Sequence, residues 1–292
     1  MFRNALLASI LLLCSLPSCS RTQDGTPQAR QQTPLNAAAD TVRNPVLKKR
    51  FLVALDRVTK AMETSRDTLD EDRISAASYA TFRSLTVLAR TWDRGGEFTV
   101  LIDREERDFL HEDSTRKGAA GKIMNGMLGL HAMVKILFSM RYAGNPVKMD
   151  TLETMEKALQ KKIHDRKQGI TVIASIAIDL FWYYRSILED MDREHLFEGH
   201  IEQIGQVYEQ GAGAAETDED RFLNGIYRSF EVCQVWGLML NPEKRAMLSE
   251  MNRQLIGQTQ RREGIGHQMA TGMEFLYKIT DYITRTTIDR AL

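Results

Sequence analysis

The helical spacing of apolar residues from residue 45 onward limits the fold of this chain most strongly. Apolar side chains recur every three or four residues in long stretches, which is typical of helices that bury one face. After Pro45 the only prolines are Pro146 and Pro242, so few helices are interrupted. The sequence therefore predicts an all-α fold of about ten helices, either a multi-helix bundle or an array of helical hairpins. The expected helices lie near residues 45–65, 71–92, 100–112, 115–142, 150–166, 170–190, 194–210, 218–240, 243–261 and 265–290.

Local signals place the ends of these helices. Asn44-Pro45 and Asn241-Pro242 each put a capping side chain before a proline at the first helical position. Asp150, with Glu153 three residues later, is typical of an N-cap with its reciprocal partner. Residues 98–102 could instead form a short strand. No sequence repeat period is evident, although the length leaves a solenoid possible.

The N-terminal residues predict export. Arg3 gives a short positive start, and residues 5–13 form an apolar run too short for a lasting membrane span. The run is followed by Leu16-Pro17-Ser18-Cys19, which resembles the signal of bacterial lipoproteins. This resemblance implies cleavage before Cys19 and attachment of diacylglycerol and a fatty acid such as palmitate to that cysteine. Ordinary cleavage after Ser20 is the alternative.

The same resemblance implies a location. Serine rather than aspartate at residue 20 favours the outer membrane, with the protein facing the periplasm. Several acyl chains on one residue make a stable anchor, whereas one chain holds a protein only marginally. Residues 19–44 hold almost no large apolar side chains, so they are expected to form a flexible tether. The predicted organisation is therefore a signal peptide at 1–18, a tether at 19–44 and a helical domain at 45–292.

The charge balance of the chain excludes one class of partner. The 39 lysines and arginines are matched by 39 aspartates and glutamates, so no net positive field attracts nucleic acid. Among three cysteines, Cys14 leaves with the signal and Cys19 is acylated, which leaves Cys233 without an internal disulfide partner. Its apolar neighbours indicate a buried thiol with no catalytic role.

Residues 170–184 are apolar on every helical face, which predicts a central buried helix. Asp179 lies inside this segment, and a buried carboxylate must be paired, hydrogen-bonded or protonated. It is either a structural acid or, together with Trp182 and Tyr183, part of a ligand pocket.

Metal sites have weak support. Met124, Met127 and His131 follow helical spacing, and thioether and imidazole groups suit Cu(I). Methionines at such spacing usually fill a core, so we predict no metal and no cofactor. The Asp108–His111 and Asp192–His195 pairs have short acidic arms and lie outside the apolar stripes. No catalytic motif appears elsewhere in the chain.

Two functional hypotheses follow. The first is a membrane-anchored lipoprotein whose helical domain binds a protein partner or acts as a scaffold. The second is a ligand- or metal-binding helical bundle, or an enzyme, with its pocket near Asp179. The first expects an exposed apolar surface, and the second expects an enclosed cavity at Asp179.

Overall fold

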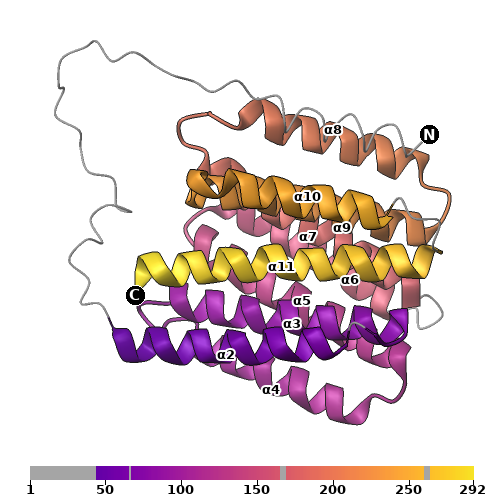
Figure 1. The fold of residues 1–292 in the computed structure, drawn as a ribbon, viewed down its shortest axis with the longest axis horizontal. Coiled ribbons are helices and arrows are strands. Elements are labelled where there is room, and N and C mark those ends of the chain that lie inside the picture. The colour runs from indigo at the N-terminus through magenta and orange to yellow at the C-terminus, as the bar shows by residue number, and fades with distance from the viewer. Residues whose placement is uncertain (1–43, 66, 165–168, 260–263) are drawn as a thin grey trace.

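The computed structural model describes residues 44–292 apart from residues 66, 165–168 and 260–263, and it confirms the all-α prediction. The described residues form ten α-helices and one 3-10 helix, with no strand (Figure 1). The helices are α2 Pro45–Thr64, α3 Asp70–Trp92, α4 Thr99–Thr115, α5 Ala119–Tyr142, α6 Pro146–His164, α7 Gly169–Met191, α8 Glu198–Ala214, α9 Asp218–Leu240, η2 Pro242–Lys244, α10 Arg245–Thr259 and α11 Ile265–Ala291. The predicted signal peptide, the tether up to residue 43 and Cys19 lie outside the described residues.

The helices form five successive hairpins that close into a ring. The inner helices α3, α5, α7, α9 and α11 each contact the next one, and α11 returns to contact α3. Each outer helix contacts two inner helices, the one before it and the one after it in the chain; the outer helices are α2, α4, α6, α8 and α10. For α2 the inner helix before it is α11, because the ring closes there. All ten lie roughly along one direction (Figure 1). The result is a two-layer ring of helical hairpins around a common core.

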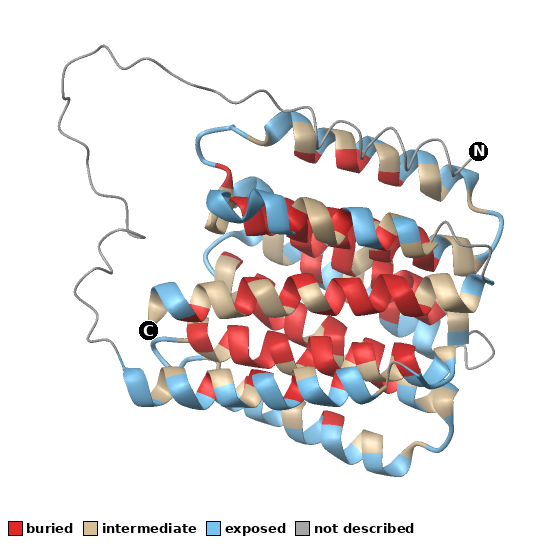
Figure 2. Cartoon of the chain, viewed as in Figure 1, coloured by how far each residue is buried: buried red, intermediate tan, exposed pale blue. Residues whose placement is uncertain are grey.

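Burial separates the two layers. Inner helices are buried on most of their faces, whereas α2 and α4 show alternating buried and exposed turns (Figure 2). Phe181, Tyr184 and Trp236 are among the largest fully buried side chains. Helix α7 lies in the inner layer, so the prediction of a central buried helix is confirmed. By length and composition α5 and α7 could cross a membrane, but most of each apolar window is buried inside the protein.

Asparagine and proline start three of the helices. Asn44 Oδ1 accepts a hydrogen bond from Leu47 N at 3.0 Å, as predicted. Asn145 Oδ1 accepts from Lys148 N at 3.1 Å, so α6 begins at Pro146. The predicted N-cap at Asp150 is therefore wrong, because the asparagine five residues earlier already caps the helix.

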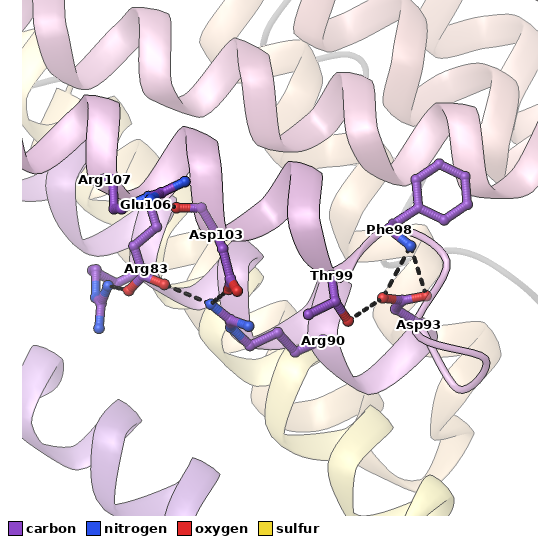
Figure 3. Close-up of polar contacts among 8 residues, drawn as sticks. All are labelled: Arg83, Arg90, Asp93, Phe98, Thr99, Asp103, Glu106 and Arg107. Carbon is purple, nitrogen blue, oxygen red and sulfur yellow. Dashed lines mark hydrogen bonds and ion pairs between the residues drawn. The ribbon is translucent and has the colours of Figure 1, made fainter.

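The structure also tests the predicted cap at Asn241 and the possible strand at residues 98–102. Asn241 precedes Pro242, but its side chain makes no capping bond, and a 3-10 turn leads into α10. Residues 99–102 belong to helix α4, so the alternative of a strand at 98–102 is wrong. Asp93 fixes this start by accepting hydrogen bonds from Phe98 N at 3.1 and 3.2 Å and from Thr99 Oγ1 at 2.8 Å (Figure 3).

Ion pairs attach the outer helix α4 to the inner helix α3. Arg90 contacts both Asp103 and Glu106 at 2.7 Å, and Arg83 forms a further ion pair with Glu106 (Figure 3). Arg83, Arg90 and Glu106 are half-buried and Asp103 is exposed, so the two pairs of Glu106 are less screened than fully exposed ones. They compensate for the small number of buried side chains on α4, of which only Ile102 and Phe109 are buried.

The segments α3–α5 and α7–α9 repeat the same structure 99 residues apart. Asp192 accepts hydrogen bonds from Leu196 N and Phe197 N, as Asp93 does from Phe98 N. Both connecting loops contain one residue with positive φ, which is Gly96 in the first and His195 in the second.

Matched contacts extend through both segments. Asn125 Nδ2 donates to the Phe109 carbonyl at 3.1 Å, and Asn224 Nδ2 donates to the Tyr208 carbonyl at 2.9 Å. Phe82 stacks on Phe109 at 4.0 Å between centroids, and Phe181 stacks on Tyr208 at 4.2 Å. Every partner lies 99 residues after its counterpart. The ring therefore contains an internal structural repeat that the sequence analysis missed.

Candidate functional site

Asp179 lies on α7, where it faces α5. Its Oδ2 is 3.4 Å from His131 Nε2, and both side chains are largely buried. The Tyr183 hydroxyl is also 3.4 Å from His131 Nε2, at the limit of a hydrogen bond. Burial raises the pKa of Tyr183 above its ordinary value, and the charges of Asp179 and Glu156 raise it further. The described contacts thus join an acid, an imidazole and a phenol between two inner helices.

Trp182 points elsewhere. It is 36% exposed, and the guanidinium carbon of Arg185 lies 5.2 Å from its ring centroid. Tyr208 of α8 meets it edge-on at 5.7 Å. Burial, followed by the charge of Asp179, raises the pKa of Tyr208 to about 12. Asp179 and Tyr183 are brought together, whereas Trp182 forms a separate aromatic and cationic contact at the surface.

The three copper-ligand candidates face different neighbours. Met127 Sδ accepts a hydrogen bond from Ser78 of α3 at 3.7 Å. His131 faces Asp179 of α7, and the Met124 methyl group lies beside Gly169 at the start of that helix. The contacts of Met127 and His131 thus lie with different helices, α3 and α7. Within the described residues, no group of three or more His, Cys, Asp or Glu side chains could hold a metal ion.

The remaining chemical candidates have structural surroundings. Asp192 is buried and holds the loop before α8 through the backbone amides of Leu196 and Phe197, at 3.0 and 2.7 Å. Cys233 is a buried free thiol, and burial raises its pKa above the ordinary value. A protonated, inaccessible thiol is a poor nucleophile, which agrees with the expected buried cysteine.

A groove between the outer helices α2 and α4 is the feature that the sequence analysis missed. Its volume is about 300 Å³, and the outward face of α3 forms its floor. The lining residues are Val58, Ala61, Met62, Asp72, Ser75, Ala76, Tyr79, Ala80, Asp113 and Lys122. Three alanines among them leave space that longer side chains would fill. Because isolated alanines are common on helices, no sequence signal pointed to this groove.

The groove combines apolar walls with charges that have no ion-pair partner. Nineteen salt bridges form among the described residues. None of them includes Asp72, Asp113 or Lys122. Tyr79 packs its ring against Phe109 at 5.5 Å and makes no hydrogen bond through its hydroxyl in the described part of the chain. Such a combination of apolar surface and free polar groups is typical of a binding site.

A second, smaller cavity lies between α2 and α11. Its volume is about 90 Å³, and its lining residues are Thr59, Met62, Glu63, Glu274, Tyr277 and Lys278. Three of its polar groups are already paired, because the Tyr277 and Thr59 hydroxyls bond each other at 2.8 Å and Glu274 accepts from Arg73 at 2.7 Å. Neither cavity is lined by Asp179, so a pocket at that residue stays a prediction.

Comparison of the chain with protein-family models, with curated proteins and with solved structures finds no match. Its function must therefore be inferred from the chemistry of the groove and from the sequence of the N-terminal segment.

Proposed function

We propose that this protein is a lipoprotein of the cell envelope, held on the outer membrane through acylated Cys19 and facing the periplasm. Its helical ring binds a protein partner, and the groove between α2 and α4 is the contact site. The groove is the observation that carries the binding role, since it joins an apolar floor to unpaired charges. The lipobox-like Leu16-Pro17-Ser18-Cys19 supports the anchor.

The position of α2 also favours this arrangement. Helix α2 follows directly after the proposed tether, beginning at Pro45, and it forms one wall of the groove. An anchored chain searches a small volume near the membrane, which raises its effective concentration toward partners in the same envelope. A modest binding groove is sufficient under these conditions.

Replacing Cys19 with alanine is expected to abolish fatty-acid labelling and to move the protein from the membrane to the soluble fraction. The physical reason is that the acyl chains supply the membrane affinity. The measurement is metabolic labelling with a palmitate analogue, followed by membrane fractionation. Cys14→Ala is the matched control and should stay labelled and membrane-bound. A wild-type protein that is unlabelled and soluble would indicate ordinary cleavage and refute the anchor.

A photo-crosslinking residue at Ala61 is expected to capture one defined partner in intact cells, because Ala61 lines the groove. The same residue placed at Val53, which is exposed on α2 but does not line the groove, serves as the control. Capture is analysed by mass spectrometry after denaturing purification. Equal capture from both positions, or none from Ala61, would contradict the groove as the contact site.

A further inference from the structure

The internal repeat offers a direct comparison for the groove. The 99-residue shift that matches α3 with α7 places Ser175 at the position of Ala76. Matching the Asn-Pro starts of α2 and α6 places Lys162 at the position of Ala61. Burial supports the second alignment, since Phe51 matches Leu152 and Val58 matches Leu159, and all four are buried.

Helices α2–α5 form the first unit of the repeat, and helices α6–α9 form the second. In the second unit a lysine occupies the place that Ala61 holds in the first. Lys162 Nζ reaches from α6 to α7 and donates to Ser175 Oγ at 2.6 Å. Nearby, Asp218 has a pKa below its ordinary value, mainly because Thr171 donates a hydrogen bond to it. The charges of Arg221 and Lys162 add to that effect. An alkylammonium group on a flexible stem therefore lies across the α6–α7 junction against the Ser175 hydroxyl.

In the first unit the matched position of the outer helix carries no lysine. Ala61 and Ala76 stand where the second unit has Lys162 and Ser175, and a cavity of about 300 Å³ opens there. The acidic residues of the two units come from different positions in the repeat. Asp72 and Asp113 line this groove, where the matched residues of the second unit are Thr171 and Ala212.

We propose that the groove binds an alkylammonium group, which takes the place that Lys162 fills in the second unit. The methylene stem lies on Met62, Ala76 and Tyr79, and the ammonium faces Asp72 and Asp113. Lys122 also lines the groove, so its charge opposes the ligand and limits the affinity. This inference rests on the groove that carries the proposed function, and it names the chemistry that the groove selects.

One ligand chemistry has two sources here, a free amine or the lysine side chain of a protein partner. The first arm of the test titrates the full-length protein in detergent micelles with Nα-acetyl-lysine methylamide and, separately, with butylamine. Binding is followed by NMR chemical shifts, and Nα-acetyl-norleucine methylamide is the uncharged control. Saturable binding of both amines, with none of the norleucine probe, is expected. Equal binding of the norleucine probe would overturn the proposal.

Substitutions in the groove test where the ammonium group binds. Ala61→Lys copies the second unit and should remove binding, and because Ala61 is exposed the fold should be unaffected, with an unchanged Tm. Asp72→Asn combined with Asp113→Asn should weaken binding by about tenfold or more, as expected for lost charge-assisted contacts. Lys122→Ala should strengthen it. Lys162→Ala, the matched change in the second unit, should leave it unchanged. Unaltered binding by Ala61→Lys would also overturn the proposal.

The second arm of the test distinguishes a free amine from the lysine of a protein partner. It also distinguishes the docking proposal from the ammonium proposal. If a partner lysine is the natural ligand, butylamine should compete with photo-crosslinking from Ala61 in membrane preparations. If butylamine binds but does not reduce crosslinking, a free amine is the ligand. If a partner is captured and no amine binds the protein, the docking role stands and the ammonium proposal fails.

Discussion

Replacing Arg228 with methionine is expected to lower the free energy of unfolding by about 3–5 kcal/mol, the usual cost of leaving a buried charge unpaired. Arg228 and Glu231 lie one turn apart on the inner helix α9. Arg228 Nη1 donates to Glu231 Oε2 at 2.6 Å, and their side chains are only 4% and 6% exposed. The variant keeps a similar apolar volume but removes the counter-charge, so Glu231 stays buried without its cation. Denaturant unfolding followed by circular dichroism measures the loss.

The double variant Arg228→Met, Glu231→Leu is the matched control. Removing both charges should restore most of the stability, because a buried pair adds little over well-packed apolar side chains. Arg228 Nε has no hydrogen-bond partner among the described residues, so the native pair is itself incompletely satisfied. A double variant as unstable as the single one would show that packing, rather than charge, is responsible.

The same pair gives a pH dependence with a defined sign. Burial raises the pKa of Glu231 above its ordinary value, and Arg228 opposes that shift. Without Arg228 the pKa rises further, so the folded variant holds a proton that the unfolded chain releases at pH values above about 4.3. The stability of Arg228→Met should therefore fall as pH rises from about 4 toward neutrality, and its deficit relative to wild type should be smallest at low pH. A deficit independent of pH would contradict a charge effect.

The sequence was sufficient to predict the helices and the central position of α7. Apolar periodicity and Asn-Pro starts are local signals, and they placed the helices correctly, although the predicted cap at Asn241 is absent because its side chain makes no capping bond. The start of α6 was predicted at Asp150, whereas Asn145 and Pro146 supply the actual start, because together they combine a cap with a preset φ. Ring closure depends on the contact of α3 with α11, nearly 200 residues apart, which no local pattern encodes.

The repeat and the groove escaped detection for related reasons. The two units share a few identical contact residues, such as Asn125 and Asn224, but most matched positions differ, as Ser78 and Ala177 do, so no repeat period stands out. A groove produced by small residues has no motif, because what matters is the side chain that is missing. Asp179 stood out by its charge in an apolar segment, and the structure shows what it contacts, namely His131. Its predicted role in a ligand pocket remains to be tested.

Replacing Gly225 with leucine is the second change expected to have a large effect, a loss of about 3 kcal/mol or more, or failure to fold. A Cβ atom at Gly225 would lie 2.9 Å from the carbonyl carbon and Cβ of Ala177, where α9 crosses α7. Backbone atoms cannot move aside as a flexible side chain can, so the two inner helices must separate. Gly126 has the matching position in the first unit, where its Cβ would lie 2.5 Å from Ser78 Cβ.

The control is the same substitution at Gly257, a helical glycine of α10 whose missing Cβ has no atom of the described residues within 4 Å. Gly257→Leu should raise stability by about 0.5–1 kcal/mol, because leucine favours the helix and meets no neighbour. Thermal and denaturant unfolding of both variants compares a crowded with an open site for one and the same side chain. Similar effects at both positions would mean that α7 and α9 do not approach closely, and the inner ring would then have to be looser than the structure has it. Opposite signs would establish that the missing side chain of Gly225 sets the spacing of α7 and α9 in the inner ring.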